Sequence, residues 1–197
     1  MSRIERINPQ KAEGTIRKLL EAVRRRVGMT PNLIRTMACS AATLAGYLGL
    51  DEALGKGALS SREREQIALA VAEANGCGYC LAAHTASGKL FGLSELEVCD
   101  ARRGSATAKR EDAILKFAGE VLARRGHVRD NELRRVRRAG LTDGEITEIV
   151  ANVALNVFTN YMTEVAATKV DFPPAAVVEA CEHLTHPFQT QNKKEQR

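Results

Sequence analysis

Residues 60–89 predict two consecutive helices, and this pair indicates a helical fold for the chain. Apolar residues recur every three or four positions on either side of a break at Asn75-Gly76, as they do on one face of an α-helix. Both residues of the break tolerate the left-handed conformation that closes a helix. Ser60 and Glu63 match a capping box, which predicts where the first helix begins and gives Glu63 a structural role.

The second of these helices carries the residues with most chemical potential. Cys77 and Cys80 fall in its first turn, where free N–H groups and the helix dipole favour a thiolate. His84 follows one turn beyond Cys80, so it is better placed to take a proton from Cys80 than from Cys77. Glu65 lies in the second turn of the preceding helix among small residues, which let a neighbouring helix approach closely and bury it in part.

Three interpretations of this cluster remain open from the residues alone. The first is a reactive dithiol with its own base. The second is half of a zinc site completed by Cys181, His183 and His186, although that spacing is unlike a usual zinc finger and leaves His84 without a role. The third is a pair of plain buried cysteines. For Glu65 the common alternative is an ordinary solvated glutamate on a helix.

The spacing Glu65-x11-Cys77-x2-Cys80-x3-His84 resembles the signature of the alkylhydroperoxidase D-like branch of the carboxymuconolactone decarboxylase superfamily. The resemblance covers roughly residues 8–175. It extends to three flanking runs: Leu59-Ser60-x-Arg62-Glu63, Ala82-Ala83-His84-Thr85 and Asn156-Val157-Phe158-Thr159-Asn160-Tyr161. One position departs from it, because Tyr79 stands between the cysteines where the best-studied members carry histidine.

The resemblance implies a compact all-α domain without a β-sheet, assembled as a homotrimer or homohexamer. It also implies an antioxidant enzyme, a thiol-dependent peroxidase that needs no cofactor and no metal. Cys80 would attack the peroxide, His84 and Glu65 would move the proton, and Cys77 would close a disulfide that an external dithiol reduces. Two alternatives are a lactone decarboxylase of the wider superfamily, which needs no redox dithiol, and a non-enzymatic zinc-binding module.

Composition supports a helical domain with a core of aliphatic side chains. Of the 197 residues, 44% are hydrophobic but only 4% are aromatic, which suits closely packed helices. We expect one domain over residues 1–184 and a polar, disordered tail over residues 185–197. The net charge of +5 is a mild excess, and the 24 acidic residues interspersed among 29 basic ones argue against a nucleic-acid partner.

The expected location is the cytoplasm. The N-terminal residues lack the apolar core of a secretory signal, and no run approaches the roughly 18 apolar residues that a membrane span requires. Membranes are therefore not an expected partner. In the cytoplasm a Cys-x-x-Cys motif is more often redox-active or metal-binding than structural.

Helical periodicity and capping signals predict the other elements. The expected helices are 9–27, one beginning at Thr30-Pro31 and running through Met37, 41–54, 94–104, 107–125, one capped by Asp130, and a long one from the capping box of Thr142 and Glu145 to about Thr168. Asn152, Asn156 and Asn160 form a row on the long helix. Such amides need partners, either across helices or, as the resemblance favours, at the dithiol.

Overall fold

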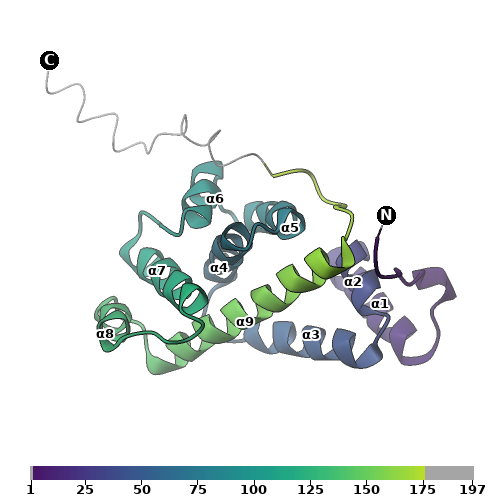
Figure 1. Ribbon diagram of the computed structural model, residues 1–197, viewed down its shortest axis with the longest axis horizontal. Coiled ribbons are helices and arrows are strands. Elements are labelled where there is room, and N and C mark those ends of the chain that lie inside the picture. The colour runs from purple at the N-terminus through teal and green to yellow at the C-terminus, as the bar shows by residue number, and fades with distance from the viewer. Residues whose placement is uncertain (1, 176–197) are drawn as a thin grey trace, which may run out of the picture.

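The structure is a computed structural model that describes residues 2–175, and within that range it is all-α, as predicted. The predicted tail, residues 185–197, lies outside the described residues. The described part has no strand. Its helices are η1 (Pro9–Lys11, a 3-10 helix), α1 (Gly14–Val27), α2 (Asn32–Met37), α3 (Ala41–Leu54), α4 (Ser61–Ala74), α5 (Gly78–Leu90), α6 (Glu95–Arg102), α7 (Lys109–Ala123), α8 (Asp130–Arg138) and α9 (Asp143–Ala166) (Figure 1).

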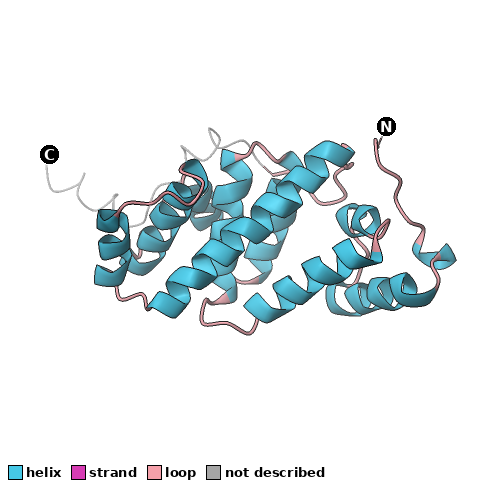
Figure 2. Cartoon of the chain, turned by 60° about the horizontal axis from the view of Figure 1, so that its bottom comes forward, coloured by secondary structure: helices cyan, strands magenta, loops and turns pink. Residues whose placement is uncertain are grey.

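Two helices organise the packing. The helix α4 contacts α5, α6, α7 and α9, while α9 also contacts α2, α3, α5 and α7. In Figures 1 and 2 the long α9 runs across the molecule, with α1–α3 near one end and α7 and α8 near the other. Small side chains let the neighbours approach α4 closely, since Ala68 and Ala72 on this helix are buried. No helix of the described range is both long and apolar enough to cross a membrane.

Local signals placed most helix ends correctly, with three exceptions. The predicted capping boxes form at Ser60 for α4 and at Thr142 for α9. The first predicted helix is divided, because the backbone is extended at Ala12 between η1 and α1. Thr30 does not cap α2, whose N-cap is Pro31.

The third exception is α8, where Asp130 is the first helical residue and not the cap. The N-cap is Arg129, whose backbone and side chain both bond to Glu132. Asp130 therefore lies inside the first turn, where its negative charge interacts favourably with the helix dipole.

The buried apolar residues form three clusters. One joins α4, α7, α8 and α9, and a smaller one joins α4, α6 and α7. The third lies between α1–α3 and the start of α5, and it contains Cys77, Tyr79 and Cys80. The two cysteines are thus part of the contact between the N-terminal helices and the central helix pair.

Candidate functional site

The turn between α4 and α5 forms where the sequence predicts it. Gly76 takes the left-handed conformation with φ +64°, and Cys77 is the N-cap of α5. The Asn75 side chain donates a hydrogen bond of 2.8 Å from Nδ2 to Asn160 Oδ1. This bond attaches the turn to α9 and so fixes the cysteines against the long helix.

The two thiols share a small set of polar contacts. Cys77 Sγ accepts a hydrogen bond from the Cys80 backbone N–H at 3.3 Å. The hydroxyl of Thr163, on α9, lies 3.1 Å from Cys77 Sγ and 3.8 Å from Cys80 Sγ. Both cysteines are free thiols and both are buried. The capping position therefore gives Cys77 a backbone donor that a thiolate would use.

These contacts separate the acidities of the two thiols. The side-chain hydrogen bond from Cys80, aided by Thr163 and the Cys80 N–H, lowers the pKa of Cys77 to about 7 against the effect of burial. The hydrogen bond to Cys77, burial and repulsion from Cys77 raise the pKa of Cys80. When the dithiol loses one proton, the negative charge is therefore more stable on Cys77 than on Cys80. Proton transfer from Cys80 to His84 stays a prediction.

The histidine and the upstream glutamate meet across the helix pair. His84 Nδ1 lies 2.8 Å from Glu65 Oε2, so Glu65 is bonded and is not simply solvated. Burial disfavours the charged imidazole, but attraction by Glu65 and its hydrogen bond outweigh burial and raise the pKa of His84. Glu65 therefore favours the protonated form of His84.

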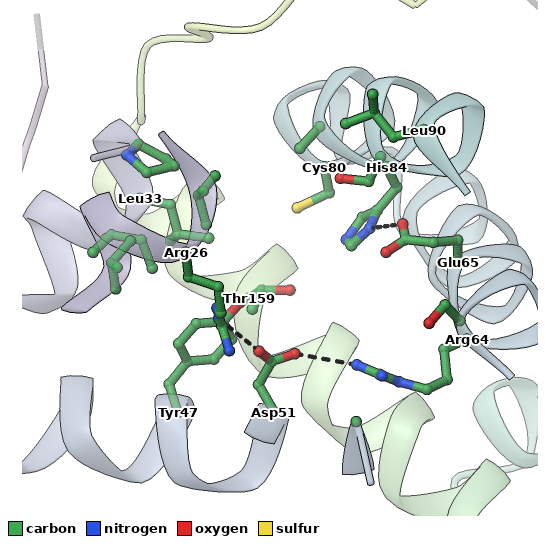
Figure 3. Close-up of a pocket in the computed structure, with 18 of the residues that line it drawn as sticks. Arg26, Leu33, Tyr47, Asp51, Arg64, Glu65, Cys80, His84, Leu90 and Thr159 are labelled. Atoms are coloured by element: carbon green, nitrogen blue, oxygen red, sulfur yellow. Dashed lines mark hydrogen bonds and ion pairs between the residues drawn. The ribbon is translucent and has the colours of Figure 1, made fainter. Parts of the chain in front are cut away.

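A cavity of about 600 Å³ opens beside these groups. Cys80, His84 and Glu65 line one side of it, as Figure 3 shows, whereas Cys77 is not among its lining residues. The opposite side is formed by α1, α2 and α3. The apolar part of the wall is made of Leu33, Ile34, Tyr47, Leu90, Phe91 and Phe172. A small molecule in this cavity would meet Cys80 first.

Tyr79, the residue that departs from the family pattern, is a structural anchor. Its hydroxyl donates to Asp171 Oδ1 at 2.9 Å and accepts from the Leu33 N–H at 3.2 Å. Its ring packs edge-on against Phe172, with ring centroids 5.7 Å apart. Burial raises the pKa of Tyr79, so the phenol stays protonated. Tyr79 thus ties the start of α5 to α2 and to the segment after α9.

The asparagine row of α9, Asn152, Asn156 and Asn160, was expected to bond across helices or at the dithiol. Asn152 and Asn156 each donate to a backbone carbonyl one turn earlier in the helix. Asn160 makes the contact with Asn75 across helices, and its amide also favours the thiolate of Cys80. Only Asn160 therefore supports the dithiol.

Sequence reasoning missed two sets of site residues. Thr163 could have been found, because it lies three residues after Asn160 on the same buried face of α9. The second set is Arg26, Asp51 and Arg64: Arg26 bonds to Asp51, and all three residues line the cavity. No local pattern connects those three residues, since they come from three different helices.

The metal alternative receives no support from the described residues. Within residues 2–175, no group of three or more His, Cys, Asp or Glu side chains could hold a metal ion. Its further candidate ligands, Cys181, His183 and His186, lie outside the described residues.

The fold and the site define a class of all-α protein, in which a helical hairpin brings a Cys-x-x-Cys pair beside a Glu–His pair. Residues 41–123, which run from α3 to the end of α7, match the carboxymuconolactone decarboxylase family. The matched segment contains the helices that carry the Glu–His pair and the two cysteines, and the fold described next is similar to that of an alkylhydroperoxidase AhpD core.

Three solved structures share the fold over most of their length. An alkylhydroperoxidase AhpD core protein of Ralstonia eutropha JMP134, described as an uncharacterized peroxidase-related protein, is 25% identical with a TM-score of 0.79, covering 86% of this chain and 92% of its own. A peroxidase-related protein of Silicibacter sp. TM1040 is 24% identical with a TM-score of 0.72, covering 89% and 96%. The debrominase Bmp8 is 18% identical with a TM-score of 0.73, covering 91% and 95%. No curated protein matches the sequence.

Proposed function

We propose that this protein is a thiol-dependent peroxidase that reduces peroxides through a Cys77–Cys80 dithiol–disulfide cycle. The observation that carries the proposal is the position of Cys80, which lines a cavity together with the Glu65–His84 pair. The Cys80 thiol also forms a hydrogen bond with the buried Cys77 thiol. Access favours Cys80 as the attacking thiol, because Cys77 is fully buried and does not line the cavity.

The first half of the cycle forms a sulfenic acid. The Cys80 proton moves to the Cys77 thiolate along the hydrogen bond between the two side chains. This transfer leaves the Cys80 thiolate facing the cavity. That thiolate attacks the terminal oxygen of the hydroperoxide, so an S–O bond forms while the O–O bond breaks. The alkoxide that leaves takes a proton from His84, which Glu65 holds in its charged form.

The second half forms the disulfide. His84, now neutral, takes the proton of Cys77, and the Cys77 thiolate attacks the sulfur of the Cys80 sulfenic acid. Hydroxide leaves and is protonated to water by His84. The sum is one dithiol and one hydroperoxide converted to one disulfide, one alcohol and one water. An external dithiol then reduces the disulfide by exchange.

The test separates the two cysteines. Wild-type protein should consume peroxide continuously with dithiothreitol as the reductant. Cys77→Ser should consume one equivalent and accumulate a sulfenic acid on Cys80 that dimedone traps, whereas Cys80→Ser should do neither. Cys39→Ser is the matched control, because Cys39 is an exposed free thiol that does not line the cavity, and its loss should change nothing. Dimedone on Cys77 in the Cys80→Ser protein would reverse the assigned roles.

The same variants address the alternatives. A lactone decarboxylase does not need thiols, so an activity of that kind would survive Cys80→Ser. A zinc-binding module would be isolated with stoichiometric metal, which elemental analysis of the full chain would detect.

A further inference from the structure

Three charged side chains from three helices meet at the cavity, at the end opposite Cys80 in Figure 3. Arg26 of α1 bonds to Asp51 of α3, with 2.8 Å between Nη2 and Oδ2. Arg64 of α4 approaches the other oxygen of the same carboxylate, with 3.4 Å between Nη2 and Oδ1. All three residues line the cavity. Two guanidinium groups therefore share one carboxylate.

The remaining ionic side chains of the cavity wall pair with one another and not with these two arginines. Lys56 pairs with Glu52 at 2.7 Å, and both are largely exposed. His84 pairs with Glu65. The Arg64 side chain is only 19% exposed, and its Nε is buried without a hydrogen-bond partner within residues 2–175. A largely buried guanidinium group that has only a share in one carboxylate is costly, so this end of the cavity can accept one further anionic oxygen group.

The rest of the cavity suits an apolar molecule of some size. Its volume of about 600 Å³ is far greater than hydrogen peroxide would need, and it is typical of pockets for drug-sized ligands. Leu33, Ile34 and Phe172 are among the apolar side chains of its wall. The cavity therefore combines two arginines that share one carboxylate, an apolar wall and a thiol.

We propose that the substrate is an apolar organic hydroperoxide that carries a carboxylate, which Arg64 binds while the hydroperoxide reaches Cys80. This inference rests on the peroxidase function proposed above. A carboxylate beside Arg64 would complete two charge pairs from two guanidinium groups. Asp51 then competes with the substrate for Arg64, so the two residues should affect binding in opposite directions.

Binding can be tested without any turnover. Isothermal titration calorimetry of the full-length, reduced protein would compare 4-phenylbutyrate with its neutral analogue 4-phenylbutanamide. We expect the carboxylate to bind about tenfold more tightly, which is the usual order for a charge-assisted hydrogen bond. Arg64→Gln should abolish that preference and Asp51→Asn should increase it. Arg62→Gln is the matched control on the same helix, because Arg62 bonds to Glu97 away from the cavity.

Arg64→Gln and Asp51→Asn should change the carboxylate preference in opposite directions. A general structural defect would instead weaken binding in both variants. Equal binding of the two ligands to the wild-type protein would overturn the proposal. So would a preference that survives Arg64→Gln, or one that Asp51→Asn diminishes.

A kinetic comparison separates this proposal from the peroxidase function. The ratio kcat/KM should be about tenfold higher for the para-carboxylate of cumene hydroperoxide than for cumene hydroperoxide itself, and Arg64→Gln should remove the difference. If neither peroxide is consumed while the carboxylate preference in binding remains, the peroxidase function fails and the anion site stands. If both are consumed at equal rates, the peroxidase function stands and the substrate class is wrong.

Discussion

The hydroxyl of Thr163 lies within hydrogen-bond distance of both sulfurs, and its one proton can point to a sulfur or to a backbone carbonyl. In the structure this hydroxyl donates to the Asn160 carbonyl at 2.8 Å, which leaves its oxygen free to accept from the Cys77 thiol. When Cys77 ionises, the same hydrogen can turn to the sulfur. Thr163 therefore adjusts to either protonation state of Cys77.

This contact predicts a separation between two substitutions. Thr163→Val keeps the shape but removes the donor, so it should raise the pKa of Cys77 from about 7 toward the ordinary thiol value. Thr163→Ser keeps the donor and should leave that pKa nearly unchanged. The pH dependence of iodoacetamide labelling at Cys77, followed by mass spectrometry, measures it. The same pKa in both variants would mean that Thr163 acts only by packing.

Glu65 and Glu63 are two glutamates of one helix with different roles. Glu65→Gln should lower the pKa of His84, because burial would then act without the opposing charge. Glu63→Gln, on the capping box, should leave that pKa unchanged. An NMR titration of the His84 ring measures both, and peroxide turnover should fall strongly only in Glu65→Gln. Equal, small effects on turnover would make Glu65 an ordinary helix glutamate.

The raised pKa of His84 also affects stability. A group whose folded pKa is raised stabilises the fold fully below its unfolded pKa, which is about 6.5 for histidine. That contribution is lost as the pH rises through the folded pKa. Removal of the Glu65 charge should therefore reduce stability most below about pH 6.5.

At the scale of elements, one arginine joins the start of α4 to the start of α9. Arg110 of α7 bonds to Glu63 Oε1 at 2.7 Å and to Glu145 Oε1, and these glutamates belong to the two capping boxes. Glu63 and Glu145 are largely buried at 9% and 12% exposure. Glu63→Gln should therefore cost some stability, although a capping box alone would tolerate it.

Replacement of Arg110 should destabilise the fold more than a comparable surface change. We expect Arg110→Met to lower the free energy of unfolding by about 1–2 kcal/mol, because two pairs with largely buried carboxylates are lost. Arg134→Met, at an exposed position of α8, should change it by less than about 0.5 kcal/mol. Urea denaturation of both variants measures the difference, and equal values would show that the junction adds nothing.

The pH dependence of this junction has a defined sign. The backbone and side chain of Thr142, together with Arg110, lower the pKa of Glu145 to about 2. A group with a lowered folded pKa stabilises the fold above its unfolded pKa, about 4.3 for glutamate, and loses that contribution as the pH falls to the folded value. The cost of Arg110→Met should therefore be full at neutral pH and decrease between about pH 4 and pH 2.

At the scale of the whole molecule, α9 leaves an apolar stripe exposed. Val150, Phe158, Tyr161 and Val165 recur at helical spacing, and their exposed fractions are 43%, 37%, 59% and 61%. The homo-oligomer expected from the family would give this stripe a partner, because exposed apolar surface of this kind often marks an interface.

The stripe predicts how to disrupt the oligomer. Tyr161→Glu should lower the molar mass in solution, since it places a charge in the centre of the apolar stripe. Leu50→Glu, at an exposed apolar position on α3 outside the stripe, should not. Light scattering coupled to size-exclusion chromatography measures the mass. A monomeric wild-type protein, or an unchanged mass in Tyr161→Glu, would show that this face is no interface.

What the sequence alone determined was local. The capping boxes at Ser60 and Thr142, the break at Asn75-Gly76 and the placement of Cys77 at a helix start depend on contacts within a few residues, so spacing was enough to predict them. A joint role for Glu65 and His84 was implied only by the family resemblance, and their contact at 2.8 Å appears only in the folded helix pair.

The tertiary structure decided the cavity, the order of the two thiol pKa values and the anion-seeking end. Thr163 and Cys77 are 86 residues apart in the sequence. Asp51 binds Arg26 and Arg64, which are 25 and 13 residues away from it in the sequence. Each of these contacts needs several helices to be packed first. Their energies depend on burial and direction in the folded chain, and no spacing along the sequence carries that information.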